Sequence, residues 1–166
     1  MHFKGLLHRG IRPSNFTVGN GKKNSKIYLI DFATTLRYRL AKNNQHFKEG
    51  YKGFNRHNTH FSSCNVNKGY DGSRRDDLQS WLYMIVYFLK GTLPWKKISV
   101  MNEYTRENRI LEMKEATTNE ELCEGLPAGF QQLGKYISSL KFTERPSYSF
   151  MKNLLRDMLK AMGEEF

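Results

Sequence analysis

The clearest pattern along the chain is a set of apolar residues that recur every three or four positions after Asp76. This spacing is typical of one face of an α-helix, and the set comprises Leu78, Trp81, Leu82, Ile85, Phe88 and Leu89. Gly91 and Pro94 follow, and both residue types commonly end helices. The sequence therefore predicts a helix that starts at Asp76, is buried along the apolar run 81–89 and ends at Gly91.

The remainder of the second half also has helical patterning. We expect four further helices, over residues 103–113, 119–123, 128–140 and 147–162. Pro127 and Pro146 lie close to the starts of the last two, where proline is tolerated because its missing N–H would have no partner. Residues 76–166 should thus form a helical core.

The first half of the chain is rich in Gly, Asn, Ser and His and has little helical patterning. Two short apolar segments, 16–18 and 27–30, flank a Gly-Asn-Gly sequence and are predicted to pair as a small β-hairpin. The long polar stretch 42–72 favours loops. We expect one domain over residues 1–166, mainly α with a minor β element, with its binding loops in residues 1–75.

Charge is distributed unevenly between the two halves. Residues 1–75 contain 15 Lys and Arg against Asp31, Glu49 and Asp71, a balance of +12, whereas residues 76–166 are close to neutral and the whole chain carries +11. Such a bias favours acidic or phosphate-rich partners by long-range attraction. A solvated basic surface explains the same bias equally simply, so only a motif can decide between the two.

We expect no membrane span, and neither a disulfide frame nor a zinc site at the cysteines. The run 81–89 is far shorter than a membrane-spanning helix, and residues 1–10 lack the apolar segment and cleavage site of a secretion signal. Cys64 and Cys123 have no CxxC spacing or partner histidines, which favours reduced thiols. We expect an intracellular protein, cytoplasmic or nuclear, without membrane contact.

The first chemical motif spans His8–Asn15, which reads HRGIRPSN, and Asp31-Phe32-Ala33 follows sixteen residues later. The order and spacing resemble the catalytic loop (H-R-D-x-x-x-x-N) and the metal-binding D-F-G sequence of protein kinases. In that pattern an aspartate acts as the base, while an asparagine and a second aspartate hold Mg²⁺. Here Gly10 stands at the position of the base.

Four later segments make the resemblance more specific. They are Ser73–Ser80 (SRRDDLQS), Leu93-Pro94-Trp95, the segment 122–127 (LCEGLP) and Arg145-Pro146-Ser147-Tyr148, together with Ser63-Cys64-Asn65 in place of the general A-P-E. In this order the chain resembles the casein kinase 1 family of serine/threonine protein kinases over almost its whole length. The resemblance implies the C-terminal lobe of a kinase, without the N-lobe that carries the glycine-rich loop and the nucleotide-binding lysine.

Departures from the family pattern concern catalysis. Glycine at position 10 can neither accept a proton nor orient a substrate hydroxyl. Arg12 replaces the lysine of the loop, and Ala33 replaces the glycine after Asp31-Phe32. The substrate-facing stretch reads Arg56–Phe61 (RHNTHF) and lacks the glycine and arginine that the family has there.

The resemblance also assigns candidate binding residues, each with a simpler structural alternative. Asn15 and Asp31 correspond to nucleotide and Mg²⁺ ligands, or they are relics that bond to their own loops. Arg74, with help from Lys114, corresponds to an anion-binding position, or it forms an ordinary salt bridge. Asp77 is expected to hold the catalytic-loop backbone from the start of the long helix.

Three functional hypotheses follow. The first is a catalytically impaired pseudokinase that serves as a protein-binding or structural module in a larger assembly, with an acidic or phosphorylated protein as one class of partner. The second is a residually active serine/threonine kinase, and the third, supported only by charge, is a nucleic-acid binder, which we do not expect. No cofactor is expected, and Mg·ATP would bind at most weakly. A protein partner should cover the face near Phe3, Leu6, Ile30 and Phe32, where an N-lobe would sit.

Overall fold

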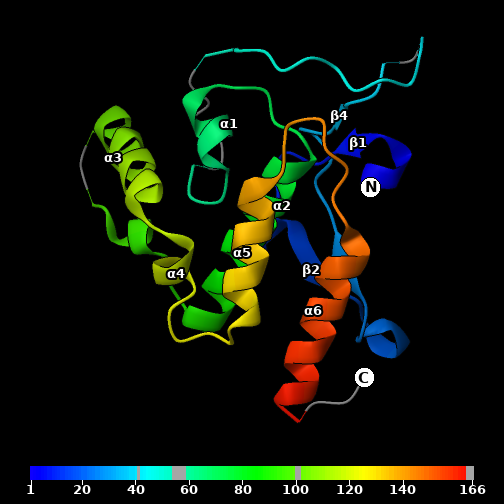
Figure 1. The fold of residues 1–166 in the computed structure, drawn as a ribbon, viewed down its shortest axis with the longest axis vertical. Coiled ribbons are helices and arrows are strands. Elements are labelled where there is room, and N and C mark those ends of the chain that lie inside the picture. Colours follow the sequence, from blue (N-terminus) through cyan, green and yellow to red (C-terminus); the bar gives the residue numbers. More distant parts are fainter. Residues whose placement is uncertain (41, 54–58, 100–101, 164–166) are drawn as a thin grey trace.

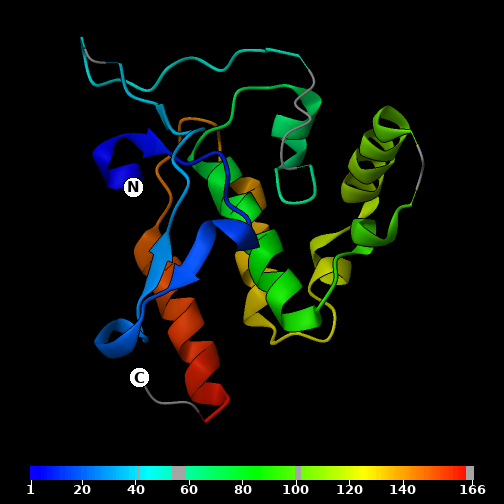
Figure 2. The same ribbon diagram turned by 180° about the vertical axis from the view of Figure 1, so that it is seen from behind.

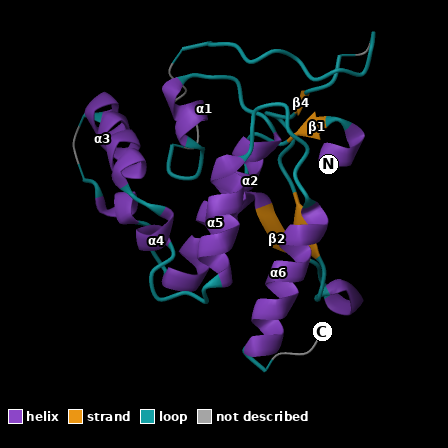
Figure 3. Cartoon of the chain, viewed as in Figure 1, coloured by secondary structure: helices purple, strands orange, loops and turns teal. Residues whose placement is uncertain are grey.

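The fold of the chain is mainly α-helical with two small antiparallel β-sheets (Figure 3). A computed structural model describes residues 1–40, 42–53, 59–99 and 102–163. Its α-helices are α1 (Cys64–Lys68), α2 (Arg74–Lys90), α3 (Glu103–Ala116), α4 (Asn119–Leu122), α5 (Gly129–Ser139) and α6 (Tyr148–Ala161). Its strands are β1 (Leu6–Leu7), β2 (Phe16–Val18), β3 (Ile27–Leu29) and β4 (Leu36–Arg37). The 3₁₀-helices are η1 (His2–Lys4), η2 (Pro13–Asn15), η3 (Gly21–Lys23) and η4 (Pro94–Lys97).

Helix α2 lies at the centre of the molecule, and both of its ends are set by the local sequence. At its start, the Asp76 carboxylate accepts a hydrogen bond from the Ser73 backbone N–H (2.7 Å), and Asp76 and Asp77 place negative charge at the positive end of the helix dipole. At its end Gly91 adopts φ 73°, a left-handed conformation that glycine takes without strain. The predicted helix is confirmed, with its start two residues earlier than Asp76.

The hydrophobic core forms where α5 packs against α2, and α6 in turn packs against α5 (Figure 1). Leu82 and Val86 of α2 and Leu133 and Ile137 of α5 are fully or almost fully buried. Trp95 of η4 joins them and donates its indole N–H to the His60 carbonyl (2.8 Å). Most of the core thus comes from residues 76–166, as the sequence predicts, and Ile11 and Phe61 add to it from the first half of the chain.

The β-structure lies on the opposite side of the molecule from α3 (Figure 2). Strands β2 and β3 pair antiparallel with Phe16 opposite Leu29, which confirms the predicted hairpin. A second pair, β1 with β4, joins Leu6 to Arg37 and Leu7 to Leu36. Sequence patterning does not predict this second pair, because each of its strands has only two residues and pairs across a long loop.

Two predictions about helices are wrong. Helix α1 forms inside the polar stretch predicted as loop, because Ser63 accepts a hydrogen bond from the Val66 N–H (3.2 Å) and Gly69 closes the helix at φ 99°. The predicted burial of the run 81–89 is wrong at its end, since Phe88 and Leu89 are 55% and 53% exposed. Over the described ranges, no helix combines the length and apolarity needed to cross a membrane.

Candidate functional site

Four of the predicted site residues lie together in the loops that precede β2 and follow β3. The start of this region is held by Asp77 of α2, whose two carboxylate oxygens accept hydrogen bonds from the backbone N–H groups of His8 and Arg9, both at 2.8 Å. Arg9 adopts φ 64°, which is uncommon for a residue with a Cβ. Asp77 therefore fixes the loop backbone from the helix start, as predicted from the sequence.

Asn15 and Gly10 are joined directly. The Asn15 side-chain amide donates to the Gly10 carbonyl (2.8 Å), and the Asn15 carbonyl accepts from the Ile30 N–H (2.9 Å). The Asn15 side chain is buried and is used to hold its own loop together, which is the simpler of the two roles considered above. Its Oδ1 remains an oxygen of the kind that Mg²⁺ prefers.

Asp31 is held next to Arg12. One guanidinium nitrogen of Arg12 lies 3.7 Å from the Asp31 carboxylate, and both side chains are about two-fifths exposed (42% and 43%). Asp31 adopts φ 61°, a left-handed conformation that Asp takes more readily than most residues with a Cβ. An exposed pair at this distance contributes little to stability. Because this ion pair is weak, a metal ion bound to the Asp31 carboxylate would displace Arg12 from it at little energetic cost.

The space around Gly10 contains polar atoms that are already engaged. A Cβ placed on Gly10 would lie 3.1 Å from the Thr34 hydroxyl, 3.3 Å from the Asn15 amide nitrogen and 3.4 Å from His8 Nδ1. His8 Nδ1 accepts from the Gly10 N–H (3.2 Å), so its proton is on Nε2, which donates to the Ile30 carbonyl (3.1 Å). With both ring nitrogens hydrogen-bonded, the buried His8 is fixed in place.

Arg74 and Lys114, predicted to bind an anion together, contact different parts of the protein. Arg74 is 6% exposed and donates to the Tyr38 hydroxyl (3.1 Å) and the Thr143 carbonyl (2.6 Å). The Lys114 ammonium donates to the carbonyls of Thr59 (2.5 Å) and Ser62 (2.6 Å) and to Asn67 Oδ1 (3.0 Å). All three donors of Lys114 are thus used by the protein itself. The positions of these two side chains give no support to the predicted anion site.

A different group of cations surrounds a pocket of about 420 Å³ beside Arg12. We call it the basic pocket and define it by Arg12, His60, Lys96 and Arg106. Burial, followed by the charges of Lys114, Lys96 and Arg106, lowers the pKa of His60. His60 Nδ1 is buried and has no hydrogen-bond partner among the residues that the structure describes. A buried polar atom of this kind normally has a partner, so it marks a place where a ligand or water would be bound.

Acidic residues also line the basic pocket but do not cancel its charge. Glu103 lies 3.7 Å from Arg106 on the surface of α3, and Glu107 is 2% exposed. Lys96 Nζ lies 3.8 Å from the ring centre of Tyr87, which fixes it at the pocket wall. Sequence reasoning placed His60 in the substrate-facing stretch but did not connect it with Lys96 and Arg106. Of that stretch, residues 56–58 lie outside the described residues.

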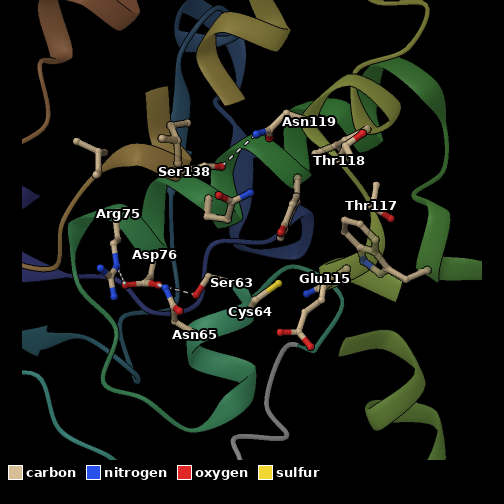
Figure 4. Close-up of a pocket in the computed structure, with 17 residues that line it drawn as sticks. Ser63, Cys64, Asn65, Arg75, Asp76, Glu115, Thr117, Thr118, Asn119 and Ser138 are labelled. Atoms are coloured by element: carbon tan, nitrogen blue, oxygen red, sulfur yellow. Dashed lines mark hydrogen bonds and ion pairs between the residues drawn. The ribbon is translucent and has the colours of Figure 1, made fainter. Parts of the chain in front are cut away.

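Another pocket, of about 410 Å³, lies between α1, α2 and α5 and the segment that joins α3 to α4 (Figure 4). Its polar side chains mostly contact each other. Asp76 accepts from Ser63 Oγ (2.6 Å) and Asn65 (3.4 Å) and lies 3.6 Å from Arg75, and burial raises its pKa. This pocket therefore contains a connected structural network rather than a set of groups awaiting a ligand.

The apolar residues named for an exposed face are largely exposed. Phe3, Phe32 and Ile30 expose 82%, 54% and 42% of their surface, while Leu6 is half-buried within β1. His8 packs against the Phe32 ring at 5.4 Å between centroids.

No protein-family model matches the chain. Among the described residues, no group of three or more His, Cys, Asp or Glu side chains is placed to hold a metal ion.

Proposed function

We propose that the chain is a casein kinase 1-like kinase C-lobe that no longer catalyses phosphate transfer and serves as a protein-binding module. Its ligand is an acidic or phosphorylated protein segment, and the basic pocket is the binding site. The observation that carries the proposal is the pocket lined by Arg12, Lys96 and Arg106, in which His60 Nδ1 has no hydrogen-bond partner within the described ranges. Cationic groups around a shared space are the usual means of binding phosphate and carboxylate groups.

Loss of catalysis follows from the chemistry at position 10. A kinase base must lie within hydrogen-bonding distance of the substrate hydroxyl. Glycine offers no such group, and His8 uses both ring nitrogens within its own loop. The loop geometry around Gly10 is nevertheless maintained by Asp77 and Asn15. A loop that keeps its backbone geometry but has no proton acceptor at position 10 is consistent with a domain that binds a partner without modifying it.

Fluorescence anisotropy with a labelled phosphoserine peptide tests the proposal. Lys96→Ala and Arg106→Ala should each weaken binding about tenfold, the usual contribution of a charge-assisted hydrogen bond. Lys97→Ala and Arg109→Ala are matched controls, since both are exposed cations close in sequence that do not line the pocket. Equal affinity for the phosphorylated and unphosphorylated peptides, or equal losses in the controls, would contradict the proposal.

The His60 ring gives an independent measurement by NMR. Burial, followed by the charges of neighbouring cations, lowers its pKa in the free protein, because both disfavour the imidazolium form. A bound phosphate places negative charge beside the ring and so favours the imidazolium form. The His60 pKa should therefore rise when the phosphoserine peptide is added. An unchanged His60 pKa at saturating peptide would place the peptide elsewhere.

Residual serine/threonine kinase activity is the second candidate, favoured by the proximity of Asn15, Arg12 and Asp31 around Gly10. Loss of a general base costs about a hundredfold to ten-thousandfold in rate, so a sensitive assay is needed. We expect no thermal shift with Mg·ATP and no transfer of labelled phosphate above that of Asp31→Asn. Transfer that disappears in Asp31→Asn would establish the kinase instead.

A further inference from the structure

The wall of the basic pocket contains apolar and aromatic side chains as well as cations. Phe61 and Ile110 are 8% and 1% exposed, and Pro13 and Tyr87 are half-buried beside them. Pro13 comes from η2, Tyr87 from the last turn of α2 and Ile110 from α3. We call these four residues the apolar wall. A ligand that offered only a phosphate or carboxylate group would leave the apolar wall uncovered.

The cations lie closer to solvent than the apolar wall does. Lys96 is exposed, and the side chains of Arg12 and Arg106 are each 42% exposed. They come from three different parts of the chain, since Lys96 belongs to η4, Arg106 to α3 and Arg12 to the loop before η2. An aromatic ring that lay against the apolar wall would therefore meet the cations at the edge of the pocket with any anionic group that it carried.

Lys96 joins the two kinds of surface. Its Nζ lies 3.8 Å from the ring centre of Tyr87 and 5.8 Å from that of Phe61. An ammonium group in this position attracts the face of a further aromatic ring as well as an anion. Arg12 and Arg106 can act in the same two ways, because a planar guanidinium stacks on rings and binds phosphate through two N–H groups. These cations thus suit a ligand in which an aromatic ring adjoins an anionic group.

One cavity holds both kinds of surface, which favours a single side chain as the occupant. Its volume of about 420 Å³ lies within the range of sites that bind whole small molecules. Successive side chains of an extended segment point to opposite sides, so a phosphoserine and a neighbouring phenylalanine would not enter the cavity together. Phosphotyrosine carries the ring and the phosphate on one side chain, and its rigid ring loses little conformational freedom on binding.

We propose that the basic pocket binds phosphotyrosine in a segment of a partner protein, with the ring against the apolar wall and the phosphate among the cations at the edge. This inference rests on the proposed function, because it concerns the same pocket. It deepens that function by naming the phosphorylated residue that the pocket selects.

Fluorescence anisotropy with labelled peptides that differ at one position measures the selection. The peptide with phosphotyrosine should bind about tenfold more tightly than the one with phosphoserine, because its ring gains apolar contact with the wall. The peptide with unmodified tyrosine should bind at least tenfold more weakly than its phosphorylated form, because it has no group for the cations. A further peptide, with phosphoserine followed by phenylalanine, should bind only as tightly as the phosphoserine peptide.

A matched pair of variants tests the contact with the ring. Tyr87→Leu removes an aromatic ring from the wall but keeps an apolar side chain, so the ratio of phosphotyrosine to phosphoserine affinity should fall severalfold. Tyr104→Leu is the control, because Tyr104 is a 55% exposed tyrosine of α3 that does not line the pocket. Its ratio should stay at about ten. A partial loss of folded protein would change both affinities equally and leave the ratio unaffected.

NMR of the unmodified protein locates the ring without any substitution. In the complex, the ring protons of phosphotyrosine should show nuclear Overhauser effects to the methyl groups of Ile110 and to the Pro13 ring. Both residues belong to the apolar wall, and neither carries a charge that would attract the phosphate. A complex in which these effects are absent would place the ring outside the pocket and overturn the inference.

The peptide series separates failure of this inference from failure of the proposed function. Equal affinities for phosphotyrosine and phosphoserine would overturn the selection, while leaving the recognition of phosphorylated segments intact. The same holds if phosphoserine followed by phenylalanine bound as tightly as phosphotyrosine, since ring and phosphate would then come from two residues. Should neither phosphorylated peptide bind more tightly than its unmodified form, the proposed function would fail together with the inference.

Discussion

Replacement of Lys114 by methionine should destabilise the protein more than replacement of any exposed lysine. Lys114 is 4% exposed, and its ammonium connects α3 to the carbonyls of Thr59 and Ser62 and to Asn67 of α1. It also lies 5.1 Å and 5.2 Å from the ring centres of Tyr83 and Trp95. Methionine is unbranched like lysine and keeps the apolar contacts, so the change removes mainly the charge and the donors.

The expected magnitude follows from the three acceptors that remain. Each buried oxygen left without a donor costs about 1–3 kcal/mol. One effect keeps the sum towards its lower end, because the energetic cost of burying the Lys114 charge is removed together with its donors. We therefore expect a loss of about 3 kcal/mol in the free energy of unfolding, a large share of the usual total.

Urea denaturation at pH 6, where the Lys114 ammonium is charged, measures this loss through tryptophan fluorescence. Lys90→Met is the matched control, because Lys90 is an exposed residue at the end of α2 that makes one hydrogen bond, to the Leu122 carbonyl (3.2 Å). Its loss should be below about 1 kcal/mol. If Lys114→Met and Lys90→Met lost equal stability, the buried ammonium would not connect these elements as described.

Three further outcomes are expected. Burial lowers the pKa of Lys114 from 10.5 to about 7, so above pH 7 this lysine is protonated in the unfolded chain but mostly neutral in the folded one. The free energy of unfolding should therefore rise by about 1 kcal/mol from pH 7 to 8. A rise of equal size in Lys114→Met would refute the assignment. Asp77→Asn should lower the free energy of unfolding, measured in urea, by about 2–4 kcal/mol, because an amide nitrogen then faces one of the backbone N–H groups of His8 and Arg9. A loss under 1 kcal/mol would show that Asp77 does not hold the loop backbone. Burial raises the pKa of the Cys64 and Cys123 thiols. Both should therefore react at least tenfold more slowly with Ellman's reagent at pH 8 in the folded protein than after unfolding in urea. Equal rates in the two states would refute this effect of burial.

Local sequence predicted the regular elements where signals were strong and close together. Helix α2 has an apolar stripe, acidic residues in its first turn and a terminal glycine, all within one segment. Helix α1 escaped prediction because its five residues have no apolar periodicity and depend on Ser63 and Gly69 as caps. The two-residue strands β1 and β4 depend on pairing between distant segments, which periodicity cannot indicate.

The candidate site was predictable only in part. The order of the catalytic-loop motif placed Gly10, Asn15 and Asp31 together, and hydrogen bonds from the loop backbone to Asp77 were expected from the same motif. The partners of Arg74 and Lys114 were not, because Thr143, Thr59 and Asn67 come from separate parts of the chain. The same applies to the convergence of His60 with Lys96 and Arg106.

The sequence by itself determined the mainly α-helical class, the hairpin β2–β3, the positive first half and the absence of a carboxylate at position 10. These properties depend on residue identity and on neighbours a few positions away. Tertiary structure alone decided which cations line a pocket, since Arg74 and Lys114 donate to buried groups of the protein while Lys96 and Arg106 lie at the pocket wall. Whether a charge is available depends on the acceptors that folding brings within about 3 Å of it, and the sequence does not list those acceptors.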